Sequence, residues 1–193
     1  PRPGEEPRPP ASVIARSNLP AETAPLIGRR RETEEVQELL RASRLVTLTG
    51  IGGVGKTRLA VHVARSPEMP RERGPWFVDF AELKATSAQE TPSVERIAAP
   101  VARELELPRR GLDTSDMDQL VQLLATRETL LVLDNCEHVV ADAAVFVAEL
   151  LRRAPRVRVL ATSREPLGVP DEHLLAVDTL DTEPLEPDGV SVA

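Results

Sequence analysis

Residues 45–57, LVTLTGIGGVGKT, decide the fold. The run at 45–49 has the short, β-rich composition of a strand, and Gly50 ends it. Residues 50–57 match the spacing G-x-x-x-x-G-K-[ST], and the pattern of residues 56–65 predicts a helix directly after them. Strand, glycine-rich turn and helix therefore follow one another in the order that a phosphate-binding loop, or P-loop, requires.

Each part of the P-loop has a chemical task. Its glycines allow backbone conformations that turn successive N–H groups towards a phosphate, and the next helix directs its positive dipole end at the same anion. Lys56 is expected to hold the β- and γ-phosphates, and the Thr57 hydroxyl is expected to bind Mg²⁺. The alternative is a plain glycine-rich turn without a ligand. The predicted phosphate-binding residues are Gly50, Gly52, Gly53, Val54, Gly55, Lys56, Thr57 and Arg58.

The rest of the chain alternates between predicted strands and predicted helices. Further strands are predicted at 76–80, 130–133, 157–161 and 174–177. Apolar positions at helical spacing predict helices at 30–42, 94–105, 117–124 and 144–153, although Pro100 weakens the second of these. Alternating strands and helices predict an α/β fold, in which a parallel five-stranded sheet is covered by helices on both faces.

Asp134 directly follows the almost wholly apolar run at 130–133, which is typical of a strand buried on both faces. Ligands of open parallel sheets bind at the carboxyl ends of the strands. We therefore expect Asp134 to act on Mg²⁺ through water, together with Thr57. The alternative, an aspartate that caps the next helix, is compatible with the same role.

The group that activates water for hydrolysis stays open. Asn135 can orient a water molecule but cannot accept a proton at neutral pH. Glu137 and His138 are nearby candidates for the base, and either is equally compatible with a solvated loop position. The predicted catalytic residues are Lys56, Asp134, Asn135, Glu137 and Arg164.

Arg164 follows the predicted strand at 157–161 and two hydroxyl residues, Thr162 and Ser163. A permanent positive charge at that strand end can stabilise a transferring phosphate and report whether the third phosphate is present. The alternative is a surface salt bridge.

Composition and charge exclude several classes of function. The 31 acidic and 24 basic residues give a formal charge of −7, and aromatic residues make up 2% of the chain, so we expect no direct DNA binding by this segment. The single cysteine, Cys136, excludes an internal disulfide, and no zinc-ligand spacing is present. No apolar stretch is long enough to span a membrane, so we expect a cytoplasmic protein without a membrane partner.

The composition also suggests boundaries. Residues 1–18 are rich in proline and charge and are predicted to be a linker, residues 19–180 a single domain, and residues 181–193 an acidic tail or linker. Two such ends suggest a segment of a longer chain.

Four motifs together resemble the nucleotide-binding domain of the STAND class, the signal-transduction ATPases with numerous domains, over about residues 18–180. They are Leu26-Ile27-Gly28-Arg29 followed by Glu32, the P-loop GIGGVGKT, LLVLDNCEH at 130–138, and LATSREPL at 160–167. Large bacterial transcriptional regulators of the LuxR and SARP types carry similar motifs in this order.

The resemblance implies a P-loop NTPase sandwich of three layers with strand order 5-1-4-3-2, and it implies that Ile27, Gly28 and Arg29 flank an adenine. It further implies an ATP/ADP switch with slow hydrolysis, which acts through a winged helix and a DNA-binding domain of the same longer chain and through a nucleotide-dependent homo-oligomer. This sequence departs from many relatives by carrying Asn135 where they have a second acid, and it stops before the helical lid and winged-helix modules. Alternatives are a vigorous ATPase or kinase and an interaction domain with a vestigial pocket.

Overall fold

A sheet of five parallel strands forms the centre of the chain in this computed structural model, which describes residues 17–22, 24–70, 72, 74–84, 91–107 and 114–179. The strands are β1 (Leu45–Thr49), β2 (Trp76–Asp79), β3 (Thr129–Asp134), β4 (Val157–Ser163) and β5 (His173–Ala176). Most of the predicted linker at 1–18 and the whole predicted tail at 181–193 lie outside the described residues.

The strands lie in the order β2-β3-β4-β1-β5. Counted from β5, this is the order 5-1-4-3-2, so the predicted topology is confirmed. β4 lies between β1, which precedes the P-loop, and β3, which ends at Asp134. The register pairs Thr49 with Ser163 and Asp79 with Asp134, so the carboxyl ends of these strands lie side by side.

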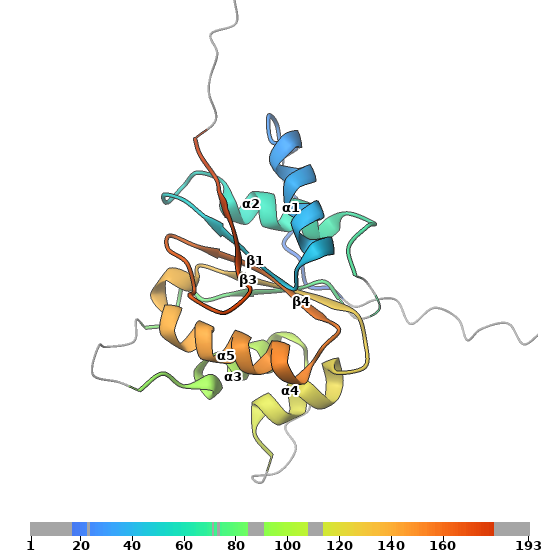
Figure 1. Cartoon of the computed structure of the whole chain (residues 1–193), viewed down its shortest axis with the longest axis vertical. Coiled ribbons are helices and arrows are strands. Elements are labelled where there is room, and N and C mark those ends of the chain that lie inside the picture. The colour runs from blue at the N-terminus through green and yellow to red at the C-terminus, as the bar shows by residue number, and fades with distance from the viewer. Residues whose placement is uncertain are drawn as a thin grey trace, which may run out of the picture.

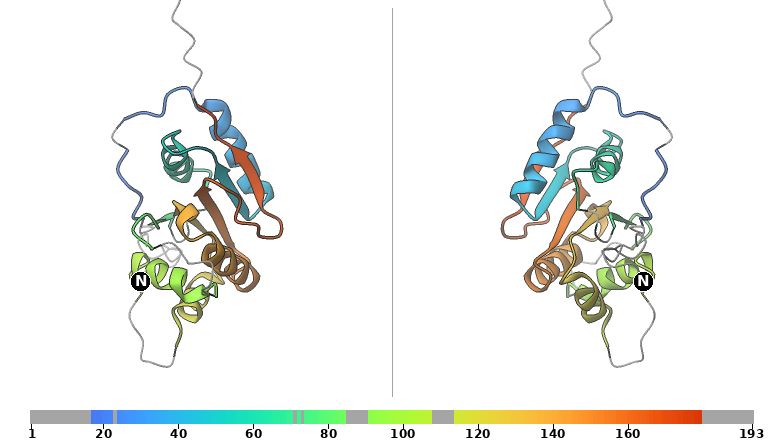
Figure 2. Two further views of the ribbon diagram at one scale, coloured as in Figure 1. Left: turned by 90° about the vertical axis from the view of Figure 1, so that its left-hand side faces the viewer. Right: turned by 90° about the vertical axis from the view of Figure 1, so that its right-hand side faces the viewer.

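Helices cover both faces of the sheet, as predicted (Figure 1). α1 (Arg30–Ala42) and α2 (Lys56–Arg65) lie on one face, and α3 (Val94–Glu104), α4 (Asp116–Leu124) and α5 (Val140–Arg153) lie on the other. Figure 2 shows the same three layers from the two sides. The fold is therefore the α/β/α sandwich expected from the sequence.

The core consists of two apolar clusters, one on each face of the sheet. Along β3, Leu130 and Val132 pack into the cluster beneath α1 and α2, whereas Leu131 and Leu133 pack into the cluster beneath α3, α4 and α5. All four side chains are fully buried. This two-sided burial explains the unbroken apolar run, because a strand covered on both faces has no solvent-facing positions.

Some boundaries differ from the expectation. α5 begins at Val140 instead of residue 144, after a short 3₁₀ turn at Cys136–His138, and β5 spans His173–Ala176 rather than 174–177. β4 continues through Ser163, because Thr162 and Ser163 extend the pairing with β1. Pro100 lies inside α3, which continues past it with an apolar face of four buried residues, Ile97, Ala98, Val101 and Ala102.

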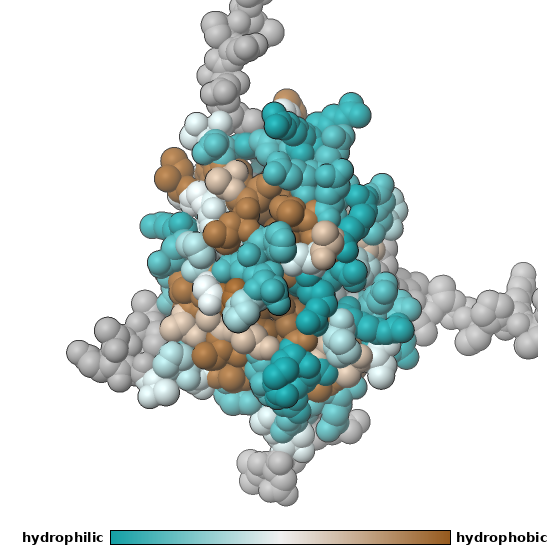
Figure 3. Space-filling model, in the orientation of Figure 1, coloured by the Kyte–Doolittle hydropathy of each residue, from teal (hydrophilic) through white to brown (hydrophobic). Residues whose placement is uncertain are grey.

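The surface mixes polar and apolar residues. On the face seen in Figure 3, apolar residues form separate patches among hydrophilic ones. The large apolar side chains that are exposed in the described part of the chain are Ile27, Ile51 and Leu174. Within the described residues, no helix has both the length and the apolar character needed to cross a membrane.

Candidate functional site

The predicted site residues gather where three neighbouring strands end. The P-loop connects β1 to α2, Asp134 is the last residue of β3, and Arg164 directly follows β4. The carboxyl edge of a parallel sheet is where such folds bind ligands, because strand ends and helix starts leave backbone groups available there. The candidate site therefore contains residues more than one hundred positions apart in the sequence.

The glycines of the P-loop are required by its conformation. Gly53 and Gly55 have φ angles of 80° and 99°, which residues with a side chain rarely adopt. Gly55 is the residue that precedes α2. A Cβ atom on Gly50 would lie 2.5 Å from the carbonyl oxygen of Val177, in the segment that leaves β5. The loop thus packs closely against the chain that follows the sheet.

Lys56 lies at the start of α2 with its ammonium turned back over the loop. Its Nζ donates hydrogen bonds of 2.8 and 3.0 Å to the carbonyl oxygens of Gly50 and Ile51, and the residue is 7% exposed. A buried ammonium needs such partners, since an unpaired charge at this depth is unfavourable. The charge is held beside the cavity that the P-loop lines, within reach of an anion bound there.

Asp134 receives hydrogen bonds from both sides. The Thr57 hydroxyl lies 2.8 Å from Oδ1 of Asp134, and the Thr162 hydroxyl donates to the same oxygen at 2.5 Å. Burial raises the pKa of Asp134; these two hydroxyls act against that shift, whereas the nearby charges of Asp79 and Glu137 add to it. Among the described residues, the partners that donate to this buried carboxylate are hydroxyl and amide groups.

This donor set fits Mg²⁺. A hydroxyl and a carboxylate supply the hard oxygen ligands that Mg²⁺ prefers, and the ion commonly keeps several waters beside few protein ligands. No cluster of three His, Cys, Asp or Glu side chains that could hold a metal occurs among the described residues. Thr57 and Asp134, whose side-chain oxygens lie 2.8 Å apart, are the residues that would hold the ion.

Asn135 adopts a left-handed backbone conformation, with φ 59°, immediately after Asp134. Its backbone N–H donates to the Thr162 hydroxyl at 3.1 Å, and its side-chain Nδ2 donates to Asp79 at 2.8 Å and to Asp134 at 3.2 Å. Asp79 was not among the predicted site residues. It is the second-last residue of the predicted strand 76–80, which lies next to Asp134's strand in the expected order, and this position is the signal that could have found it.

Glu137 and Arg164 form an ion pair at the cavity. Arg164 Nε lies 3.2 Å from Glu137 Oε1, and the two side chains are 63% and 11% exposed. The second carboxylate oxygen of Glu137 is buried, and among the described residues it has no hydrogen-bond partner. Arg164 also lies over the P-loop, because a Cβ atom on Gly52 would be 3.5 Å from its Nη2. The arginine therefore bridges Glu137 and the P-loop.

These groups enclose one cavity of about 400 Å³. It is lined by Gly52, Gly53, Gly55, Lys56, Thr57, Arg58, Ala81, Asn135, Glu137, His138 and Arg164. Most of the predicted phosphate-binding and catalytic residues thus line the same cavity.

The three residues expected near an adenine do not line this cavity, and of these Arg29 contacts the P-loop through Val54. Ile27 is an exposed apolar side chain, and Gly28 has a φ angle of 75°. Arg29 is 5% exposed, and its guanidinium donates to the carbonyl oxygens of Val54 at 3.2 Å and Asp178 at 2.5 Å and to Glu32 at 2.6 Å. Arg29 therefore ties the P-loop to the segment that follows β5.

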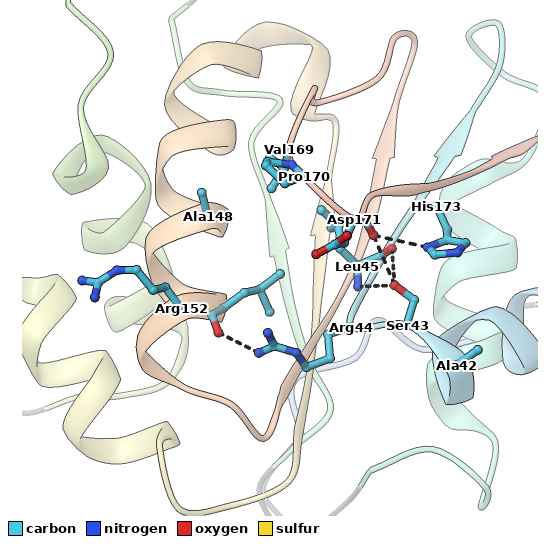
Figure 4. A pocket seen from close by; sticks show the side chains of 11 residues that line it. Ala42, Ser43, Arg44, Leu45, Ala148, Arg152, Val169, Pro170, Asp171 and His173 are labelled. Carbon is cyan, nitrogen blue, oxygen red and sulfur yellow. Dashed lines mark hydrogen bonds between the residues drawn. The ribbon is translucent and has the colours of Figure 1, made fainter.

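A second cavity, of about 510 Å³, lies near the amino ends of β1 and β5 (Figure 4). Its polar groups are engaged with one another: Ser43 Oγ lies within hydrogen-bond distance of the Leu45 and Asp171 carbonyl oxygens, which share its single proton, and Arg44 donates to the Leu151 carbonyl oxygen. The cavity at the P-loop is the better candidate site, because it lies at the carboxyl edge of the sheet and is lined by Lys56, Thr57 and Arg164.

The chain is similar to a known domain family and to parts of larger proteins. Residues 29–190 match the NB-ARC domain. A putative HTH-type transcriptional regulator of Mycobacterium tuberculosis is 42% identical over 137 residues, which are 71% of this chain and 14% of that protein. Regulatory protein AfsR of Streptomyces griseus is 30% identical over 191 residues, covering 94% of this chain and 19% of AfsR. The chain spans less than a fifth of either relative's length.

Solved structures share the architecture. A STAND protein with a tetratricopeptide repeat sensor from Pyrococcus horikoshii superimposes with a TM-score of 0.54 at 15% identity, over 88% of this chain and 25% of that one. The ORC2 protein of Aeropyrum pernix, solved as ADPNP–ADP complexes, gives a TM-score of 0.52 at 17% identity, over 78% of this chain and 48% of that one. At these identities the likeness concerns the fold.

Proposed function

The chain belongs to the NB-ARC family, and from this premise we propose that its P-loop site binds ATP and ADP with Mg²⁺ and acts as a slowly hydrolysing switch. The observation that carries the proposal is that Lys56 and Thr57 line one cavity while the Thr57 hydroxyl donates to the buried carboxylate of Asp134. A cation, a metal-binding hydroxyl and a buried carboxylate are the three groups that P-loop proteins use on nucleotide phosphates.

Phosphate binding is supported by the loop and by Lys56. The ammonium that bonds the carbonyl oxygens of Gly50 and Ile51 is available to a phosphate oxygen, a partner with a full negative charge. Mg²⁺ held by Thr57 and Asp134 would supply neutralisation of the phosphate charge. The exposed Ile27 offers an apolar surface against which an adenine ring can pack.

Arg164 is proposed to distinguish ATP from ADP. It lies over Gly52 and pairs with Glu137, so a third phosphate in the cavity would compete with Glu137 for the guanidinium. Binding of ATP would then change the contacts of the 3₁₀ turn that carries Glu137, whereas ADP would leave the ion pair in place. This difference between two states is the property that a nucleotide switch needs.

Slow hydrolysis is supported by the groups around the reacting phosphate. The residue after Asp134 is an asparagine, which cannot take a proton from water. Glu137, the nearest carboxylate after it, is engaged by Arg164. His138 lines the same cavity. With an asparagine after Asp134 and Glu137 held by Arg164, hydrolysis would be slow and the bound nucleotide would persist long enough to mark a state.

The biological role is proposed from the relatives. Because the relatives are a putative HTH-type transcriptional regulator and a regulatory protein, each about five times as long as this chain, we propose that this module controls assembly or DNA binding of a larger cytoplasmic regulator. Its partners would be other domains of the same chain, including a winged helix and a DNA-binding domain, and a second copy of the module in the ATP state.

The test is thermal unfolding of the purified chain with millimolar Mg-ATP, Mg-ADP or Mg-GTP, followed by phosphate release on the same samples. A midpoint that rises by several degrees with adenine nucleotides only, with turnover well below about 1 s⁻¹, is the expected result. Turnover at or above that rate would favour a vigorous ATPase. No rise with any nucleotide would refute the binding proposal for this chain.

A further inference from the structure

The side-chain amide of Asn135 lies between two carboxylates. Its Nδ2 donates to Oδ1 of Asp79 at 2.8 Å and to Oδ2 of Asp134 at 3.2 Å. An ionised carboxylate can only accept hydrogen bonds, so both acids require the NH₂ group of the amide and exclude its oxygen. The two acids therefore determine which way the amide is turned.

The backbone supports the same orientation. Asn135 is held in the left-handed region, with its N–H bonded to Thr162. Asp79 is held by the pairing of β2 with β3 and by the Ala81 N–H, which donates to the same Oδ1 at 2.8 Å. Neither side chain depends on a long, mobile stem, since each has only two side-chain torsions.

One polar atom of Asn135 remains. Its Oδ1 accepts no hydrogen bond from the described residues, and Asn135 lines the same cavity as the P-loop. An amide oxygen is a neutral acceptor with two lone pairs, suited to hold a water by one of its O–H bonds. With the NH₂ group committed to the acids, this oxygen is the atom of Asn135 that is left for a ligand or a water.

We propose that Asp79 is a positioning residue for hydrolysis, which acts through Asn135 by keeping the amide oxygen presented to the attacking water. The inference rests on the proposed function. As the water oxygen bonds to the γ-phosphorus, the bond from that phosphorus to the bridging oxygen breaks and its electron pair leaves with ADP. The proton lost by the water passes to an oxygen of the released phosphate, so ATP⁴⁻ and H₂O give ADP³⁻ and H₂PO₄⁻. Asn135 orients the water and takes no proton.

The orientation itself can be measured without nucleotide. In the ¹⁵N-labelled chain, the side-chain NH₂ signals of Asn135 are identified by their loss in Asn135→Ala. Asp79→Ala should shift these signals and speed their exchange with solvent by roughly tenfold, because one acceptor is lost. Glu82→Gln removes a charge from the neighbouring turn and should leave them unchanged. Signals that are the same in Asp79→Ala and the wild type would overturn the proposal.

The catalytic consequence is measured by phosphate release and by nucleotide affinity. Asp79→Ala should lower the rate constant for release by roughly 10- to 100-fold and change the Kd for Mg-ATP by less than about twofold. Asp79→Asn keeps an oxygen that can accept from Ala81 and Asn135, so it should recover most of the rate. A variant Asp79→Asn as slow as Asp79→Ala would mean that the charge matters, contrary to the proposal.

A double-mutant cycle separates action through Asn135 from independent action. The double variant of Asp79→Ala and Asn135→Ala should be no slower than Asn135→Ala alone. Additive losses would overturn the positioning role, and so would a wild type that binds Mg-ATP but releases no phosphate. If the wild type binds no nucleotide, the proposed function fails, while the NMR experiment still decides whether Asp79 orients Asn135.

Discussion

The hydroxyl of Thr57, at the start of α2, lies 2.8 and 2.9 Å from the two carboxylate oxygens of Asp134, at the end of β3. The fold thus brings the two proposed Mg²⁺-binding side chains together. Such an arrangement requires little movement on binding, but it also keeps a carboxylate where solvent cannot stabilise its charge. The burial that places Asp134 beside Thr57 therefore also destabilises the ionised carboxylate.

Replacement of Asp134 should therefore stabilise the nucleotide-free chain and remove the Mg²⁺ dependence of nucleotide binding. Asp134→Asn is expected to raise the unfolding midpoint of the nucleotide-free chain at pH 7 by roughly 2–4 °C. It removes a buried charge, keeps an oxygen for the two hydroxyls and loses the 3.2 Å hydrogen bond from Asn135. The same variant should lose the Mg²⁺ dependence of nucleotide binding. A lower midpoint would show that the ionised carboxylate stabilises the fold, against the prediction.

The pH dependence of this gain follows from the raised pKa of Asp134. A group whose pKa is higher in the folded state lowers stability as the pH rises through the interval between the unfolded and folded values. The advantage of Asp134→Asn should be complete above the folded pKa and vanish as the pH falls below 3.8, the ordinary pKa of an aspartate. Glu35→Gln, on an exposed position of α1, is the control and should show no such trend.

Lys56→Ala should abolish the nucleotide-dependent rise in the unfolding midpoint. The ammonium is the phosphate ligand, and its present partners are loop carbonyls that can turn to solvent, so the nucleotide-free chain should remain folded. The matched control is Lys84→Ala, since Lys56 and Lys84 are the two lysines of the sequence. A rise in Lys56→Ala equal to that of the wild type would refute the phosphate site.

Arg164→Ala should narrow the difference between the affinities for ATP and ADP. If the guanidinium binds the third phosphate, its loss weakens ATP binding by about tenfold, the effect of one charge-assisted hydrogen bond, and leaves ADP nearly unchanged. Isothermal titration with both nucleotides measures this. Arg152→Ala, whose ion pair with Glu149 lies away from the P-loop, serves as the control. Equal weakening of both nucleotides contradicts the sensor role.

Arg29→Ala should destabilise the fold as well as the site. The buried guanidinium satisfies two carbonyl oxygens and Glu32, so its removal is expected to lower the free energy of unfolding by about 2–3 kcal/mol. Urea unfolding measures the loss. Arg30→Ala, at an exposed neighbouring position, should leave the midpoint unchanged. A midpoint of Arg29→Ala that equals that of Arg30→Ala would show that the buried contacts contribute nothing.

Local signals predicted much of the architecture. The loop between β1 and α2 could be predicted from its glycines. The positive φ angles at Gly53 and Gly55 and the close approach at Gly50 leave few other residues possible at these positions. The predicted start of α5 at Ala144 is four residues later than the observed start at Val140. The apolar pattern used for the prediction began at Ala144, whereas Val139 and Ala143 are already packed in the core.

The sequence by itself determined the strand–loop–helix of the P-loop, the buried strand that ends in Asp134, and the parallel class of the sheet. These depend on spacing within short segments and on which side chains avoid water. Tertiary structure alone decided which side chains meet: Asn135 with Asp79, Glu137 with Arg164, and Arg29 with the carbonyl oxygens of Val54 and Asp178. Strand order and register place these partners together, and neither is encoded in the residues next to them, so the contacts exist only once the whole sheet has formed.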